Sequence, residues 1–224
     1  PHPPVNLEIQ DSSNIKPMKN TLITLIVISI TSITFSQKKL SVGIFGGPTY
    51  STFSFVNSQG EDESSNYEFI GHTAFGIQLN IENSKHILRP SLSLRQAGAK
   101  STLGTVPMTW TLNYIDLEAA YLYELVQKKS LGVSVGAGLY GGYLIGGEQT
   151  IGTKTYSLSE EEAFNPIDFG ARAMTNIRFS ITQSMSVFGE YQLGFGLSQI
   201  ENDATDQQTK NRNQAIKVGL TIEL

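Results

Sequence analysis

Strict alternation of apolar and polar residues is the feature that most constrains this chain. Between 67 and 82 the odd positions are mainly aromatic or aliphatic, whereas the even positions include Glu68, His72, Gln78 and Glu82. A period of two is typical of a β-strand whose two faces meet different surroundings, and it differs from the 3.6-residue period of a helix. The pattern recurs along the chain and predicts eight strands, at 40–48, 67–82, 86–97, 109–125, 131–145, 167–179, 186–198 and 212–224.

The connections between these runs alternate in length. The short ones are at 83–85, 126–130 and 181–184. The long ones are near 49–66, 98–108, 146–164 and 199–211. An up-and-down barrel has this property when one rim carries short turns and the other carries long loops, as transmembrane barrels do. The sequence therefore predicts an all-β chain that forms an eight-stranded antiparallel up-and-down barrel.

The length of the runs and the composition of their polar face indicate which face is outside. A strand of about 10 residues, rising roughly 3.3 Å each and tilted near 40°, covers an apolar band of about 25 Å. The polar face mixes acids, bases and glycines, which suits a lumen just wide enough for side chains to fill. The apolar face is therefore expected to meet lipid, with short periplasmic turns and long extracellular loops. Aromatic girdles are expected from Tyr67, Phe69, Trp110, Tyr121, Tyr123, Tyr143, Phe169, Phe179 and Phe195.

The inward positions predict a structural network of charges rather than a reactive site. Neither His72 nor His86 lies in a His-x-Ser pair or beside a Gly-x-Ser-x-Gly turn, so no nucleophilic arrangement is readable. No catalytic, cofactor-binding or metal-binding residue is predicted, since the chain has no cysteine and only three histidines. The predicted polar network of the lumen comprises Glu68, His72, Arg89, Arg95, Asp116, Glu118, Asp168, Arg172, Arg178, Glu190 and Lys217.

The amino-terminal region reads as a targeting segment. Lys19 precedes an uncharged apolar run at 21–35, followed by Ser36 and Gln37, which is typical of a secretory signal peptide over 18–36. The run falls short of the roughly 18 to 20 apolar residues that a membrane-spanning helix needs. Residues 1–17 are interpreted as an upstream, non-native or disordered segment, and residues 37–224 as the barrel domain.

The charge balance excludes one class of partner. Lysine and arginine number 16 against 20 acidic residues, for a net charge of −4. A nucleic-acid binder would carry a basic stripe, so no nucleic acid is expected. The acidic runs at 61–63 and 160–162 fall in predicted loops and are interpreted as solvated charge rather than as cation sites.

Several segments resemble the PorT-like outer-membrane β-barrel family of Bacteroidota. The stretch from Leu112 to Tyr121 is similar to the central strand of that family, and the glycine-rich run from Gly132 to Gly142 is similar to the strand after it. Asp168-Phe-Gly170 and the closing stretch 210–224 are similar to its later strands. Ala119 stands where the family usually has proline, and Leu224 where an aromatic is commoner. The resemblance implies a Gram-negative outer-membrane location and an eight-stranded barrel, but no single activity.

The expected function is that of an integral outer-membrane protein without enzymatic activity or cofactors. Its lumen would be filled by polar side chains, and it would act through its surface loops in envelope structure, adhesion or partner docking. Outer-membrane lipid and the outer-membrane assembly machinery are the expected partners. Two alternatives remain open: a lipid-modifying enzyme of the outer membrane, and a soluble lipocalin-like periplasmic carrier in which the two faces are reversed.

Overall fold

The computed structural model describes residues 39–158, 164–202 and 206–224. The predicted signal peptide, the segment 1–17 and the acidic run at 160–162 therefore lie outside the described residues. The described part holds one β-sheet and a 3-10 helix, η1 (Ser64–Asn66). Its strands are β1 (Lys39–Val56), β2 (Ile70–Asn83), β3 (His86–Leu103), β4 (Val106–Gln127), β5 (Leu131–Ile151), β6 (Lys154–Ser157), β7 (Ile167–Ser180), β8 (Met185–Gly196) and β9 (Gln208–Glu223).

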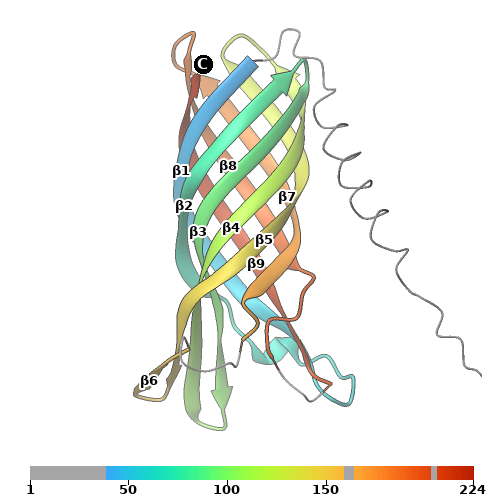
Figure 1. Cartoon of the computed structure of the whole chain (residues 1–224), viewed down its shortest axis with the longest axis vertical. Helices are drawn as coiled ribbons and strands as arrows, with labels where there is room; N and C mark the ends of the chain where they lie inside the picture. The colour runs from blue at the N-terminus through green and yellow to red at the C-terminus, as the bar shows by residue number, and fades with distance from the viewer. Residues whose placement is uncertain (1–38, 159–163, 203–205) are drawn as a thin grey trace, which may run out of the picture. The chain divides into compact units, whose positions relative to one another are not determined.

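The sheet closes on itself. Every pairing is antiparallel, and the pairs run β1-β2-β3-β4-β5-β7-β8-β9 and then return from β9 to β1. Figure 1 shows these strands winding obliquely around a long tube. A closed ring has no open edge, so most backbone groups of its strands find partners on both sides; the start of β2, which diverges from β3 beyond the Ala74–Arg95 pair, is an exception. This matters in lipid, where each unpaired backbone group costs several kcal/mol.

The described strands number nine, one more than the eight that the sequence predicts. The additional strand is β6, which lies inside the predicted loop 146–164 and pairs with the end of β5. Gly152 has a φ of +59° between the two strands, a conformation that favours glycine and permits the tight turn. The pairings that close the ring run through every described strand except β6.

The two faces of the strands have opposite exposure, in the orientation that the sequence predicts. Along β4 the even positions from Leu112 to Glu124 are buried, while the odd positions from Ile115 to Tyr123 are exposed. Asp116 has no exposed surface, whereas its neighbour Leu117 is 65% exposed. Charged residues therefore fill the inside and aliphatic residues cover the outside, which is the reverse of a lipocalin-like carrier.

The exposed apolar side chains belong to all the strands of the ring. Soluble proteins rarely expose apolar patches larger than a few hundred Å², so a surface of this kind indicates a membrane or a large partner. Within the described residues, no helix has the length and apolarity to cross a bilayer. Exposed outward residues include Ile44, Phe75, Ile77, Leu92, Leu94, Leu117, Leu139, Tyr143, Phe169, Phe179, Tyr191, Phe195, Val218 and Ile222.

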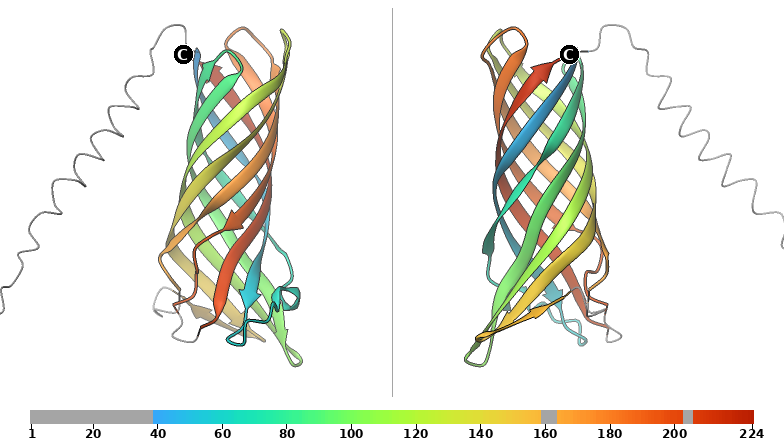
Figure 2. Two further views of the ribbon diagram at one scale, coloured as in Figure 1. Left: turned by 90° about the vertical axis from the view of Figure 1, so that its right-hand side faces the viewer. Right: turned by 60° about the vertical axis from the view of Figure 1, so that its left-hand side comes forward.

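One end of the ring carries only tight connections, and we call it the turn end. There β2 is joined to β3 by residues 84–85, β4 to β5 by 128–130 and β7 to β8 by 181–184. Lys39 at the start of β1 and Glu223 at the end of β9 also lie there and form an ion pair of 3.3 Å. We call the opposite end, which holds η1 and β6, the loop end. Figure 2 shows the two ends from further directions.

Several strands continue into the segments predicted as long loops. β3 and β4 remain paired through 98–108 as far as Leu103 and Val106, and only two residues, Gly104 and Thr105, join them. The predicted loops near 49–66 and 199–211 are likewise shortened, because β1 runs to Val56 and β9 begins at Gln208. Beyond the band of outward apolar side chains, which we call the apolar belt, the two faces of a strand no longer differ consistently in polarity. The alternation therefore fades although the backbone pairing continues. Periodicity therefore underestimates strand length.

Candidate functional site

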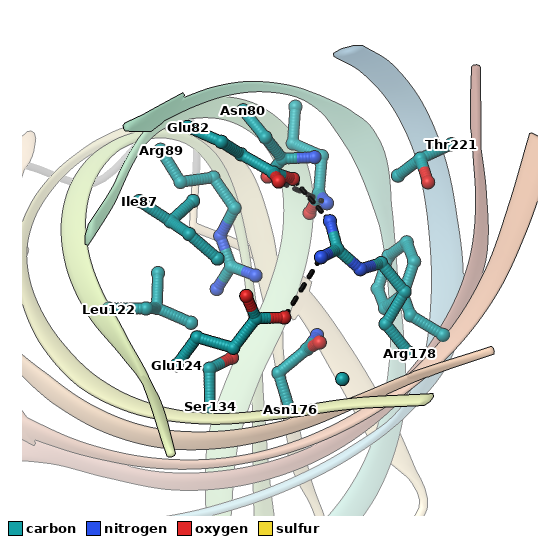
Figure 3. A pocket seen from close by; sticks show the side chains of 13 residues that line it. Asn80, Glu82, Ile87, Arg89, Leu122, Glu124, Ser134, Asn176, Arg178 and Thr221 are labelled. Atoms are coloured by element: carbon teal, nitrogen blue, oxygen red, sulfur yellow. Dashed lines mark hydrogen bonds and ion pairs between the residues drawn. The ribbon is translucent and has the colours of Figure 1, made fainter. Parts of the chain in front are cut away.

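Nearest the turn end, one arginine joins two carboxylates across the lumen. Arg178 of β7 donates from Nη2 to Glu124 of β4 at 2.9 Å and from Nη1 to Glu82 of β2. Figure 3 shows its guanidinium group between the two acids. The cavity beside these side chains has a volume of about 20 Å³. That is room for about one water molecule, so the lumen is nearly full at this level.

The next layer is organised around Glu190 of β8. Arg89 of β3 donates to its carboxylate at 2.6 Å, and the amides of Asn176 and Gln192 donate to it at 3.1 and 2.9 Å. Lys217 of β9 pairs with Glu190 in the strand register and is buried. Its ammonium group lies 4.5 Å from the centre of the Phe45 ring, within the range of a cation–π interaction.

The most buried layer contains two arginines and three acids. Arg95 of β3 donates to Asp116 of β4 at 2.7 Å and to Asp168 of β7 at 3.0 Å. Arg172 of β7 also donates to Asp116, and it donates to Glu118 at 2.6 Å. The side chains of all five residues are at most 4% exposed. The Arg95–Asp116 pair joins the adjacent strands β3 and β4, whereas the other three ion pairs join strands that are not neighbours in the ring.

Two tyrosines enclose this layer. The guanidinium carbon of Arg95 lies 4.6 Å from the ring centre of Tyr114, and that of Arg172 lies 4.1 Å from the ring centre of Tyr140. Asp168 accepts hydrogen bonds from the amide of Asn211 at 2.9 Å and from the hydroxyl of Ser198 at 3.2 Å. The aromatic faces and extra donors help to offset the loss of hydration of the buried charges.

Charges nearly balance in the lumen. Five cations, Arg89, Arg95, Arg172, Arg178 and Lys217, face six carboxylates, Glu82, Asp116, Glu118, Glu124, Asp168 and Glu190. An isolated buried charge would be far too costly, so the pairs can exist only together. A few buried polar atoms still lack a hydrogen-bond partner, among them Nη1 of Arg95 and Nε of Arg172.

An apolar cluster lies inside the barrel toward the loop end. Phe53 of β1 and Leu112 of β4 are buried there with Ile200 and Leu158, which follow β8 and β6. The rings of Tyr67 and Trp110 lie 5.7 and 6.0 Å from that of Phe53. The prediction that Tyr67 and Trp110 belong to an outer girdle is therefore wrong, because they pack against this interior cluster. We call it the apolar plug: Phe53, Ala97, Ala99, Leu112, Tyr114, Leu158 and Ile200, with Tyr67, Trp110, Leu144 and Phe164 against it.

The structure places nine of the predicted network residues together in the lumen. Eight of them form ion pairs, and Lys217 lies among them. The other two, Glu68 and His72, lie apart. Glu68 is exposed and its backbone bridges that of Lys100, while His72 is half-buried opposite Thr49. Both lie near the start of β2, beyond the ionic layers. Alternation predicts which face of the strand a residue is on, but not how far along the barrel it lies from the charged layers.

Several residues of the network were missing from the sequence prediction. Glu82 and Glu124 occupy inward positions of the alternation, and that signal identifies them as lumen residues. Tyr114, Tyr140 and Asn211 also lie at inward positions. Their residue types do not distinguish a partner of a buried charge from ordinary packing. Only the cross-lumen geometry, which depends on the register of all the strands, assigns them that role.

Chemical groups that could form a catalytic or metal site are scarce in the described residues. His72 has a buried Nε2 atom without a hydrogen-bond partner, and none of the hydrogen bonds described for the chain joins it to a serine or an acid. Among the residues described, no group of three His, Asp or Glu side chains is placed to hold a metal ion. The absence of an enzymatic site stays a prediction.

The segment between β1 and β2 at the loop end is held by its own hydrogen bonds. The side-chain oxygen of Asn57 accepts from the backbone amides of Gln59 and Glu61 at 3.0 and 2.9 Å, and its amide donates to Glu63 at 2.6 Å. The carboxylate of Asp62 accepts from the hydroxyl and the amide of Ser64, and these bonds lower the pKa of Asp62. The loop therefore presents a defined polar surface.

A broad basin opens at the turn end, with a volume of about 600 Å³. Lys39, Lys128 and Lys129 line it, together with Glu82 and Glu223. Below it the Arg178 layer fills the lumen. The basin is therefore a vestibule of the barrel end.

A closed antiparallel sheet with an apolar exterior and a charged, filled interior defines the class of integral membrane β-barrels. A family model described as outer membrane protein beta-barrel domain matches residues 35–221. The chain belongs to this family, and its location is the outer membrane.

The solved structures similar to the chain include outer-membrane proteins. Neisserial surface protein A has a TM-score of 0.48 and 9% identity, over 84% of this chain and 100% of that chain. A major outer membrane protein from Thermus thermophilus has a TM-score of 0.48 and 11% identity, over 84% and 100%. The outer membrane protease OmpT from Escherichia coli has a TM-score of 0.45 and 9% identity, over 86% and 99%. No curated protein matches the chain in sequence.

Proposed function

We propose that this chain is a closed, non-enzymatic scaffold of the outer membrane that acts through the surface at its loop end. The observation that carries this proposal is the filled lumen. Three successive layers of ion pairs and then the apolar plug occupy it from the turn end to the loop end. A barrel filled in this way supports neither free diffusion of solutes nor a substrate cavity inside, which leaves its exposed surfaces for function.

In this proposal the ring of β1 to β5 and β7 to β9 is an eight-stranded up-and-down transmembrane barrel, and β6 is part of an extracellular hairpin. The turn end faces the periplasm. The segment 18–36 directs export, and the outer-membrane assembly machinery inserts the barrel into lipid. Membership of the PorT-like branch is supported by the stretches Leu112 to Tyr121 and Gly132 to Gly142, which lie in β4 and β5.

The loop end suits adhesion or docking because parts of it are rigid. The β3–β4 hairpin extends beyond the apolar belt as a paired ribbon, and Asn57, Asp62 and Ser64 fix the turn after β1. Binding residues on rigid supports lose less conformational entropy when a partner is bound. A partner in the envelope or on another surface would meet these two segments.

A complementation experiment tests this proposal against the enzymatic alternative. A deletion strain is scored for envelope permeability, which the wild-type gene is expected to restore, and for lipid composition, which is expected to be unchanged by the deletion. Replacement of residues 57–66 by a Gly-Ser linker should abolish rescue, while His72→Ala should rescue fully at equal outer-membrane levels. Failure of His72→Ala with full rescue by the linker variant would overturn the proposal and favour the enzyme.

A further inference from the structure

The wall of the barrel has a break between β2 and β3. These strands pair from Asn83 and His86 as far as Ala74 and Arg95, with an interruption around Pro90. No described pairing joins them again until the isolated bridge between Glu68 and Lys100. The start of β2 therefore diverges from β3, and the residues between the two contacts have no ladder across this seam.

Two backbone carbonyl groups of β3 at the break accept hydrogen bonds from inside the barrel. The hydroxyl of Thr49 on β1 donates to the carbonyl of Gln96 at 3.3 Å, and that of Ser51 donates to the carbonyl of Gly98 at 2.9 Å. These side chains take the place of the missing partners on β2. The break is thus compatible with a membrane environment, because the carbonyl groups do not need the neighbouring strand.

A pocket with a volume of about 300 Å³ lies beside this break. Phe75, Leu94 and Ile145, which are exposed on the lipid-facing side of the wall, form its apolar part. Gln96 and Asn113 also line the pocket and are joined by a hydrogen bond of 3.0 Å. Apolar contacts and a few polar groups in one hollow are typical of a small-molecule site.

The inner wall of the pocket provides a buried donor. Arg95 lines it and is 4% exposed. Its Nε and Nη2 atoms are bonded to Asp116 and Asp168, whereas Nη1 has no hydrogen-bond partner. Nη1 is itself shielded from solvent, so an acceptor from the pocket reaches it only if the side chains around it shift. The hydrogen bond would then recover the free energy that a buried donor without a partner costs. A cavity of only about 10 Å³ lies on the lumen side of Arg95, too small for a ligand.

The charges around Arg95 select the kind of acceptor. The guanidinium group of Arg95 already contacts two carboxylates, Asp116 at 2.7 Å and Asp168 at 3.0 Å. An anionic head group at Nη1 would therefore be repelled by two negative charges that are held on the same guanidinium group. A neutral oxygen of an alcohol, ester or amide can accept from Nη1 without that repulsion.

We propose that this wall pocket binds an uncharged amphiphile from the surrounding lipid, with its acceptor oxygen at Nη1 of Arg95 and its chain along Phe75, Leu94 and Ile145. The pocket holds the polar group and the first carbons of the chain, and the rest of the chain lies in the bilayer. This site depends on the membrane location of the barrel but not on what the loop end binds.

Titrations of the protein in zwitterionic nanodiscs test the proposal, with the side-chain amides of Gln96 and Asn113 observed by NMR. The probes are a monoacylglycerol, the fatty acid of the same chain and the matching alkylammonium. The monoacylglycerol is expected to give saturable shifts, with at least a tenfold weaker response to the fatty acid. Tighter binding of either charged probe, or no saturable shift with any of them, would overturn the proposal.

Two outward substitutions on β3 provide a matched pair of variants. Leu94→Trp should fill the pocket and abolish the shifts, whereas Leu92→Trp, two residues away on the same lipid-facing side, should leave the affinity within about twofold of wild type. Both positions face lipid, so both variants are expected to fold. Equal binding by the two variants would show that the shifts arise from general contact with lipid and would contradict the site.

Discussion

Asp116 on β4 and Asp168 on β7 share one guanidinium group, that of Arg95 on β3. The two distances are 2.7 Å and 3.0 Å, and both acids have no exposed side-chain surface. Because β5 separates β4 from β7 in the ring, this shared contact joins non-adjacent parts of the wall across the lumen. The lumen is thus a source of rigidity that the hydrogen-bond ladders alone do not provide.

Removal of one cation from this layer should be strongly destabilising. Arg172→Ala leaves Glu118 without its ion pair and takes one of two partners from Asp116. The expected loss is about 3–5 kcal/mol in the free energy of unfolding, because a buried charge is left uncompensated. Urea unfolding in lipid vesicles measures it.

Lys39→Ala is the control for that variant. It removes an exposed ion pair with Glu223 and should change the free energy of unfolding by less than about 1 kcal/mol. Equal effects of the two substitutions would mean that the buried pairs do not stabilise the barrel.

Gly98 is required by a close approach of two strands. It has a φ of +150°, and a Cβ atom there would lie 1.9 Å from the carbonyl oxygen of Trp110. Gly98→Ala should therefore distort the β3–β4 hairpin and cost about 1–3 kcal/mol. Gly46→Ala is the matched control, since the nearest atom to its Cβ would be 3.6 Å away. Unfolding free energies that agree within error for the two variants would refute this interpretation.

A charged side chain on the lipid-facing surface should destabilise the barrel. Leu117 is 65% exposed and lies between Ile115 and Tyr121 on the outward face of β4. Leu117→Arg is expected to cost about 2–4 kcal/mol in vesicles if the residue is near the bilayer midplane. Leu117→Ala should lower the free energy of unfolding by less than Leu117→Arg. An arginine variant as stable as the wild type would place this face in water.

The carboxyl group of Asp62 should titrate below its ordinary pKa of 3.8, because the hydroxyl and amide of Ser64 hydrogen-bond its charged form. With the pKa lowered in the folded state, its contribution to stability is present above the unfolded value and is lost as the pH falls through the folded value. NMR titration of the Asp62 carboxyl carbon measures this. Ser64→Ala should move the pKa back toward 3.8, and an unchanged pKa would argue against the hydrogen bond.

Alternation alone predicts the face of most residues in the ring. Asp116, Glu118, Arg172 and Glu190 lie inside as expected, because one face of each strand is lipid-facing and the side-chain period of two fixes the other. Alternation does not predict which charged residues form ion pairs across the lumen. Asp168 and Arg95 are distant in sequence, and their contact depends on the stagger of all the intervening strands.

At the loop end, the alternation of apolar and polar residues no longer predicts the structure. Tyr67 and Trp110 contact Phe53 in the apolar plug, although interfacial aromatics and core aromatics are of the same residue types. β6 and the extensions of β3 and β4 lie outside the apolar belt, where no contrast between the two faces marks a strand. Hydrogen bonding continues there without a hydrophobic pattern, so these elements were expected to be loops.

Conductance of the purified protein in planar bilayers tests the central claim most directly, with a channel-forming porin as the positive control. In the proposed closed scaffold, the layers of Arg178, Arg89 and Arg95 and the apolar plug block a continuous water path along the lumen, so the expected current is no greater than that of the bare bilayer. Stable, discrete conductance steps that scale with the amount of inserted protein would contradict it.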